Sequence, residues 1–88
     1  MKVLIPTPLF SYTNRERMVE AKGATLAEAL FDLDRQFPGI RFRMIDEQDK
    51  IRKHIRFFIN SEQEFDLART LKAEDEIFIV QALSGGAS

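Results

Sequence analysis

Cysteine is absent from this chain of 88 residues, and its absence excludes several kinds of chemistry. Without a thiol, the chain cannot form an internal disulfide, hold zinc through thiolates or act as a thiol nucleophile. Tryptophan is also absent, and histidine occurs once, at His54. One histidine without cysteine is poor material for a metal site or a catalytic set. We therefore interpret His54 as a solvated residue of a loop or a strand edge, and we expect no metal site.

An excess of charge of either sign is also missing. The chain has 13 basic and 14 acidic residues, with a net charge of −1. This balance gives no electrostatic reason to expect nucleic acid or an anionic membrane as a partner. The stretch 41–56 is a local exception, because it holds six basic residues: Arg41, Arg43, Lys50, Arg52, Lys53 and Arg56. Such a run is usually a solvated face, but it could also dock an acidic partner.

Long apolar runs and phosphate-binding glycine motifs are lacking as well. No apolar run reaches the length that spans a bilayer, and the chain begins with a strand-like pattern in place of a signal segment, so we expect a cytoplasmic protein. Neither G-x-x-x-x-G-K-[ST] nor G-x-G-x-x-G occurs, so the chain itself is expected to bind neither ATP nor another cofactor. The acidic clusters at 62–64 and 74–76 are interpreted as solvated turns, because a general acid needs an apolar site. The sequence therefore predicts a protein that is not an enzyme.

The clearest signal that is present predicts a helix over 25–37. Thr25 and Glu28 form a capping box, in which the Thr25 hydroxyl accepts from the N–H of residue 28 and the Glu28 carboxylate reaches back to the N–H of residue 25. Pro38-Gly39 ends the helix. One face of this helix carries the apolar residues at helical spacing, which are Leu26, Leu30, Leu33 and Phe37.

Alternating apolar and polar residues on either side of the helix predict strands. Pro6 and Pro8 restrict the later half of the first strand to an edge or a loop. From the second strand, Met18 is expected to point inward, together with either Val19 or Ala21. The segment 40–45 fits either a short strand or one helical turn, and 67–71 fits one helical turn. The expected strands are 2–10, 16–22, 55–59, 64–65 and 77–80.

Alternation in the last two long strands leaves three apolar residues on the face away from the core. They are Phe58, Phe78 and Val80. A sheet with one packed face usually carries polar residues on the other. Two explanations stand equally: the three residues form an exposed docking surface, or the segment 40–53 folds over this face and buries it.

The chain closes with two glycines and two small residues, Gly85-Gly86 and Ala87-Ser88. Glycine has no side chain, so such a segment can thread a narrow channel. The residues after 83 are small and have little apolar surface to bury, so we expect a domain over 1–83 and a flexible tail over 84–88. Taken alone, Gly-Gly would favour a disordered or artificial end, and only its place after this order of strands favours a functional tail.

The order strand, strand, helix, strand, short strand, strand, with Gly-Gly after the last strand, resembles the β-grasp family of ubiquitin-like sulfur carriers. This MoaD/ThiS-like family includes the small subunit of molybdopterin synthase and the thiazole-synthesis carrier. The resemblance implies an α+β fold, with one main helix packed on a mixed sheet of four to five strands. It rests on Met1–Pro6, Gly23-Ala24-Thr25-Leu26, Phe37-Pro38-Gly39, Ile59-Asn60 and 74–79 before Ser84-Gly85-Gly86.

Three positions depart from the family pattern. Glu74-Asp75 stands where the family often has Gly-Asp, and Gln81-Ala82 where it often has proline. Many members end at the second glycine, whereas Ala87-Ser88 follows it here. Some sulfur carriers of the family have such extensions, and a metalloprotease removes them.

The resemblance implies a role for each residue of the tail. Gly86 would form the thiocarboxylate after a ubiquitin-activating-like adenylyltransferase has adenylated its carboxylate with ATP, and Ser84 and Gly85 would form the flexible arm. An amide cannot be adenylated, so a processing metalloprotease would first remove Ala87-Ser88.

The resemblance also implies the partners of the carrier. Phe58, Phe78 and Val80 would help to dock the adenylyltransferase, and a biosynthetic enzyme of cofactor or amino-acid synthesis would accept the sulfur. The carrier would be a monomer when free. The alternative is a ubiquitin-like protein modifier or a simple interaction module.

Overall fold

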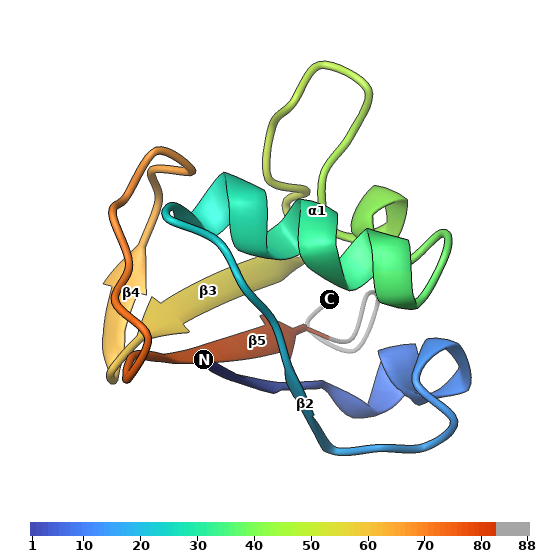
Figure 1. Cartoon of the computed structure of the whole chain (residues 1–88). Helices are drawn as coiled ribbons and strands as arrows, with labels where there is room; N and C mark the ends of the chain where they lie inside the picture. Colours follow the sequence, from blue (N-terminus) through green and yellow to red (C-terminus); the bar gives the residue numbers. More distant parts are fainter. Residues whose placement is uncertain (83–88) are drawn as a thin grey trace.

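One helix lies across one face of a five-stranded mixed sheet in the computed structural model, which describes residues 1–82 (Figure 1). The strand order is β2-β1-β5-β3-β4, with β5 at the centre, parallel to β1 and antiparallel to β3. This arrangement confirms the predicted α+β, β-grasp fold. The elements are β1 (Lys2–Leu4), β2 (Met18–Glu20), α1 (Leu26–Gln36), β3 (Ile55–Ile59), β4 (Glu62–Glu64) and β5 (Glu76–Gln81), with short 3-10 helices η1 (Thr7–Tyr12) and η2 (Arg41–Arg43).

The start of α1 follows the predicted capping box closely. The backbone N–H of Glu28 donates to Thr25 Oγ1 at 3.2 Å. The Glu28 carboxylate accepts from the backbone N–H of Ala24 at 2.8 Å, one residue before the predicted donor. Both bonds satisfy N–H groups that the helix itself leaves without partners. The helix ends at Gln36, before Pro38, as the sequence predicted.

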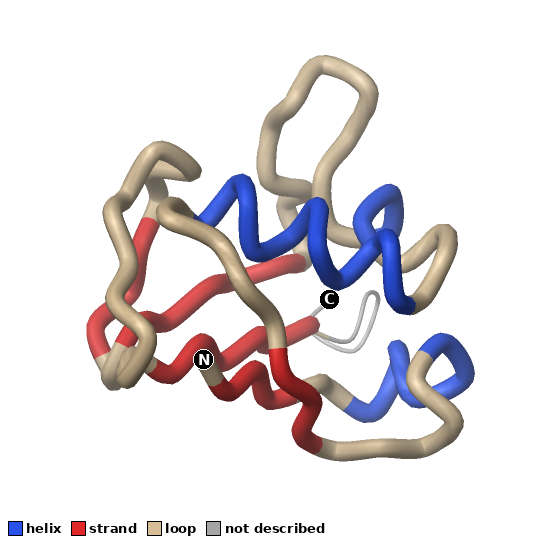
Figure 2. Tube along the Cα trace, viewed as in Figure 1, coloured by secondary structure: helices blue, strands red, loops and turns tan. Residues whose placement is uncertain are grey.

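The core lies between α1 and the facing side of the sheet (Figure 2). The helix contributes Leu26, Leu30 and Leu33, all fully buried, while Phe37 is half-buried. Complete burial of one such leucine stabilises the fold by about 1.5–3 kcal/mol. The sheet contributes buried residues at alternate positions, including Val3, Phe57, Ile59, Ile77 and Ile79.

The N-terminal hairpin differs from its prediction in two respects. The first strand stops at Leu4, and Thr7–Tyr12 forms η1, because proline has no N–H to donate to a sheet. The expectation that Met18 points inward is wrong, since its side chain is 47% exposed and Val19 is buried. Val19 pairs with Val3, and this register turns both residues toward the core.

In three segments after the helix, the structure either differs from the prediction or decides between two predicted alternatives. Within residues 40–45, Arg41–Arg43 form the helical turn η2, and Ile45 pairs with Ile51 in an isolated bridge. No helical turn forms over 67–71, where Leu71 N–H donates to Ala24 C=O at 2.9 Å. β4 lies two residues earlier than expected, because Asn60 and Ser61 both take positive φ angles, of 50° and 75°, and make a tight hairpin turn.

Candidate functional site

The predicted working residues fall beyond the part of the chain that the structure describes. Ser84, Gly85, Gly86, Ala87 and Ser88 all lie outside residues 1–82, and the boundary predicted at residue 83 does too. What the structure does place is the point from which they follow. Gln81 ends β5 and pairs with Ile55, and the N–H of Ala82 donates to His54 C=O at 2.8 Å. The tail therefore starts from the end of the central strand, where β5 is bonded to β3.

The sheet face opposite α1 carries a row of apolar side chains that crosses four strands. Met18 pairs with Leu4, Leu4 with Phe78, and Phe78 with Phe58. The row ends at Gln63 on β4. Because paired residues point to the same face of a sheet, these side chains lie next to one another. We call Met18, Leu4, Phe78, Phe58 and Val80 the outer apolar face.

The outer apolar face is accessible. Phe58, Phe78 and Leu4 are half-buried, and Val80 is 44% exposed. The proposal that residues 40–53 bury this face is wrong, because Ile40, Met44 and Ile45 pack into the core and the loop over 46–53 rises beyond α1 (Figures 1 and 2). A contiguous apolar patch rimmed by polar residues is typical of a protein-binding surface.

Sequence reasoning found part of this face and missed the rest. It singled out Phe58, Phe78 and Val80 but missed Leu4 and Met18. The alternation of β1 and β2 alone does not show which face each residue joins. The strand register supplies that information, and it was not available from the sequence.

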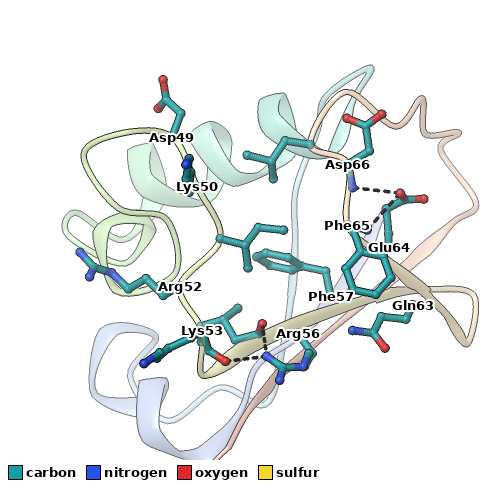
Figure 3. A pocket seen from close by; sticks show the side chains of 13 residues that line it. Asp49, Lys50, Arg52, Lys53, Arg56, Phe57, Gln63, Glu64, Phe65 and Asp66 are labelled. Carbon is teal, nitrogen blue, oxygen red and sulfur yellow. Dashed lines mark hydrogen bonds between the residues drawn. The ribbon is translucent and has the colours of Figure 1, made fainter.

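A second feature is a cleft of about 600 Å³ beside β3, shown in Figure 3. Basic side chains from 50–56 lie on one side of it, and Glu64 and Asp66 on the other. Some of these charges already have partners within the protein. Arg69 Nη1 donates to Glu64 Oε1 at 2.7 Å, and Arg56 Nη1 donates to Lys53 C=O at 2.6 Å. The acidic side of the cleft is therefore satisfied within the protein, since Asp66 Oδ1 also accepts from the N–H of Ala68 at 2.9 Å.

The carboxylates with shifted pKa values are poor proton donors. The hydrogen bond from Arg69 lowers the pKa of Glu64 below its ordinary value. The pKa of Asp32 is lowered chiefly by a hydrogen bond from Arg35, and those of Asp46 and Asp75 chiefly by backbone N–H groups of Lys50 and Lys72. A general acid near neutral pH needs the opposite shift.

Metal chemistry and membrane insertion find no support in residues 1–82. Within that range, no three histidine, cysteine, aspartate or glutamate side chains are grouped so that they could hold a metal ion. His54, the single histidine, is exposed. No helix of the described range is both long and apolar enough to cross a membrane. What the described residues offer is a partly exposed apolar sheet face and the strand from which the tail follows.

Comparisons with known proteins agree with this arrangement. The model of the ThiS family matches residues 3–86. The chain is 30% identical to the sulfur carrier protein CysO of Mycobacterium tuberculosis, with 96% of each chain covered. The crystal structure of that protein superposes with a TM-score of 0.87, at 29% identity, over 93% of this chain and 98% of that one.

Two further solved structures are similar. A chain in the crystal structure of the Amycolatopsis orientalis BexX/CysO complex is 35% identical, with a TM-score of 0.88 and coverage of 97% of this chain and 98% of that one. The small archaeal modifier SAMP1 of Haloferax volcanii is 26% identical, with a TM-score of 0.79 and 98% of each chain covered.

Proposed function

The chain belongs to the ThiS family of ubiquitin-like sulfur carriers, and we propose that its Gly86 carboxylate is the group that carries the sulfur. The chain is a carrier and not an enzyme. The observation that most supports Gly86 is the extent of the family match, which runs from residue 3 to Gly86 and leaves Ala87 and Ser88 beyond it. These are the two residues whose removal would expose a carboxylate after Gly-Gly.

The chemistry begins with proteolysis, because an amide at Gly86 cannot be adenylated. A processing metalloprotease hydrolyses the Gly86-Ala87 bond and releases the dipeptide. An oxygen of the free carboxylate then attacks the α-phosphorus of ATP on an adenylyltransferase, and pyrophosphate leaves. A sulfide donor attacks the acyl carbon, AMP leaves, and the thiocarboxylate remains on the carrier until a biosynthetic enzyme takes its sulfur. ATP is therefore used by the partner, and the chain itself binds no cofactor.

The tail residues serve this chemistry through their small size. Side chains at positions 85 and 86 would obstruct a narrow active site, whereas glycine also allows the extended and turned conformations that two different active sites require. Ser84 and Gly85 form the arm that carries Gly86 away from β5. The firm pairing of Gln81 with Ile55 gives that arm a fixed base.

The outer apolar face serves docking. Phe58, Phe78 and Val80, joined by Leu4 and Met18, contact the adenylyltransferase while the tail enters its active site. Val80 lies one residue before Gln81, the last residue of β5, so the docking surface and the base of the tail are adjacent. This adjacency lets one partner hold the domain and the working end together.

Mass spectrometry of three purified chains tests the proposal. Each is incubated with the adenylyltransferase of the same organism, ATP and sulfide. A chain truncated after Gly86 should exchange one oxygen for sulfur, while the full-length chain and a truncated Gly86→Val chain should stay unmodified. Sulfur loading of the uncut chain, or none on the truncated chain, would refute the mechanism.

A ubiquitin-like modifier is the second candidate, and the likeness to the Haloferax volcanii modifier supports it. The two functions differ in their product. A modifier ends as an isopeptide bond between Gly86 and a lysine of another protein, whereas a carrier ends as a thiocarboxylate.

A further inference from the structure

Basic side chains gather beside the base of the tail. Arg43, Arg52 and His54, together with Phe42, Ile55 and Gln81, line a hollow of about 310 Å³. We call this hollow the root pocket. The hydrogen bond from Ala82 N–H to His54 C=O, 2.8 Å long, fixes it next to the point where the chain leaves β5. A protein that receives the tail therefore meets the root pocket as it closes on the domain.

Arg52 is held in place with one edge of its guanidinium unused. Its Nε donates to Phe42 C=O at 2.8 Å, and its Cζ lies 4.6 Å from the centre of the Phe42 ring. Both contacts restrict the side chain and leave its two terminal nitrogens available. A guanidinium held in this way is suited to a bidentate bond with a carboxylate, because little side-chain freedom is lost on binding.

Arg41, in the same region, is an arginine whose charge is paired with a carboxylate. Its Cζ lies 4.2 Å from the centre of the Phe31 ring, and its Nη2 lies 3.1 Å from Asp49 Oδ1. By contrast, no carboxylate among the described residues lies within ion-pair distance of Arg43, Arg52 or Lys53. The arginines of the root pocket therefore form no ion pair with the described residues, and the charge of Arg52 acts only at longer range on Asp46, whose pKa it helps to lower.

The charge of the chain is divided between two regions. Residues 40–56 hold six basic and three acidic residues, a net charge of +3. The whole chain carries −1, so the remainder carries −4. A positive region on an otherwise negative protein orients an approaching acidic surface toward it.

Gln81 adds an acceptor to the root pocket. Its Oε1 is buried and has no hydrogen-bond partner among the described residues. The amide torsion of glutamine turns easily, so this oxygen can meet a donor that enters the pocket. A peptide supplies both a carboxylate for Arg52 and an N–H for Gln81, whereas a fully ionised phosphate supplies no donor.

We propose that the root pocket binds an acidic peptide segment at the mouth of the active site that receives the tail. The identity of that partner rests on the proposed function, but the binding chemistry does not. Gly86 is the fourth residue after Ala82, so an extended tail would place it roughly 13–14 Å away. The root pocket then stays outside the active site and faces its rim, beyond reach of the nucleotide.

A titration of the full chain with a capped tetraglutamate peptide, followed by backbone amide NMR shifts, tests the proposal without any enzyme. The shifts should concentrate at residues 42–43, 52–54 and 81, and binding should weaken as salt rises. Arg52→Gln should weaken binding about fivefold. Lys2→Gln is the matched control, because it removes the same charge near the opposite end of β5, beside Glu76.

Three results would overturn the proposal: shifts spread over other surfaces, equal effects of Arg52→Gln and Lys2→Gln, or ATP or inorganic phosphate binding these residues more tightly than the peptide. Thermal unfolding of both variants checks that the fold is kept. The titration contains neither ATP nor adenylyltransferase. A negative titration would therefore not bear on the proposed sulfur loading of Gly86. A negative sulfur-loading test would likewise not bear on whether the root pocket binds the peptide.

Discussion

Phe58 on β3 and Phe78 on β5 are directly paired in the sheet, on the face turned away from α1. Leu4 and Met18 extend this pair across β1 and β2. Large apolar side chains on an open sheet face contribute little to the core but present a surface to another protein. The sheet therefore packs against the helix on one face, and we propose that it binds a partner on the other.

Substitution of Phe78 tests that separation. Phe78→Asp should weaken binding to the adenylyltransferase by at least tenfold, because it places a charge in the middle of the outer apolar face. Calorimetric titration measures the binding, and circular dichroism checks the fold. Phe65→Asp is the matched control, since Phe65 is 74% exposed and lies off this row. Unfolding of Phe78→Asp would instead make this residue part of the core.

Leu30 should be among the residues of α1 whose substitution most destabilises the fold. Its side chain is fully buried among the sheet residues, so Leu30→Ala should lower the free energy of unfolding by about 2–5 kcal/mol. Thr25→Ala removes only the helix cap and should cost about 0.5–2 kcal/mol. Chemical denaturation measures both. An unchanged denaturation midpoint for Leu30→Ala would contradict the described core.

Gly23 is required because the chain passes close to the start of α1. A Cβ built on Gly23 would lie 2.6 Å from Ala29 N and 2.8 Å from Glu28 C, both of them backbone atoms. Gly23→Ala should therefore shift the helix start and lower the free energy of unfolding by about 1–3 kcal/mol. Ala24→Ser, at the exposed neighbour, serves as the control in the same denaturation experiment. Equal stability of Gly23→Ala and the parent chain would show that the backbone at Gly23 does not pass this close to the start of α1.

Acid should destabilise the domain through carboxylates that are hydrogen-bonded in the fold. The N–H of Lys72 and the side chain of Asn60 lower the pKa of Asp75 below its ordinary value of 3.8. A lowered pKa in the folded state stabilises the fold above the unfolded pKa, and this stabilisation is lost as pH falls through the folded value.

The free energy of unfolding should therefore be level from about pH 5 to 7 and fall below about pH 4. Asp75→Asn should reduce the decrease in the free energy of unfolding at low pH. Glu47→Gln should not have this effect, since the Glu47 side chain forms no ion pair within residues 1–82. Denaturant unfolding at a series of pH values measures the free energy of unfolding. If it falls equally steeply in acid for the parent chain and for Asp75→Asn, the prediction is wrong.

Local signals in the sequence were enough to predict the helix and the core-facing residues of the long strands. The capping box at Thr25 and the leucine spacing gave α1, and alternation gave β3 and β5. The errors have tertiary causes. The pairing of Val19 with Val3 turns Met18 outward, and the left-handed turn at Asn60-Ser61 moves β4.

Prediction of the candidate site was limited in the same way. Phe58, Phe78 and Val80 stood out because they broke an alternation, whereas Leu4 joined them only through strand register. The root pocket combines η2, the start of β3 and the end of β5. No sequence spacing predicts that these three segments meet, because their contact depends on how the chain folds between them.

The mass of the intact protein isolated from its native host tests the central claim most directly. We predict a chain that ends at Gly86, without Ala87 and Ser88, with a fraction that carries one sulfur in place of one oxygen. Alkylation of the thiocarboxylate should shift that fraction alone. A population that keeps Ala87-Ser88 throughout, or that ends at Gly86 only in isopeptide adducts with other proteins, would contradict the sulfur-carrier account.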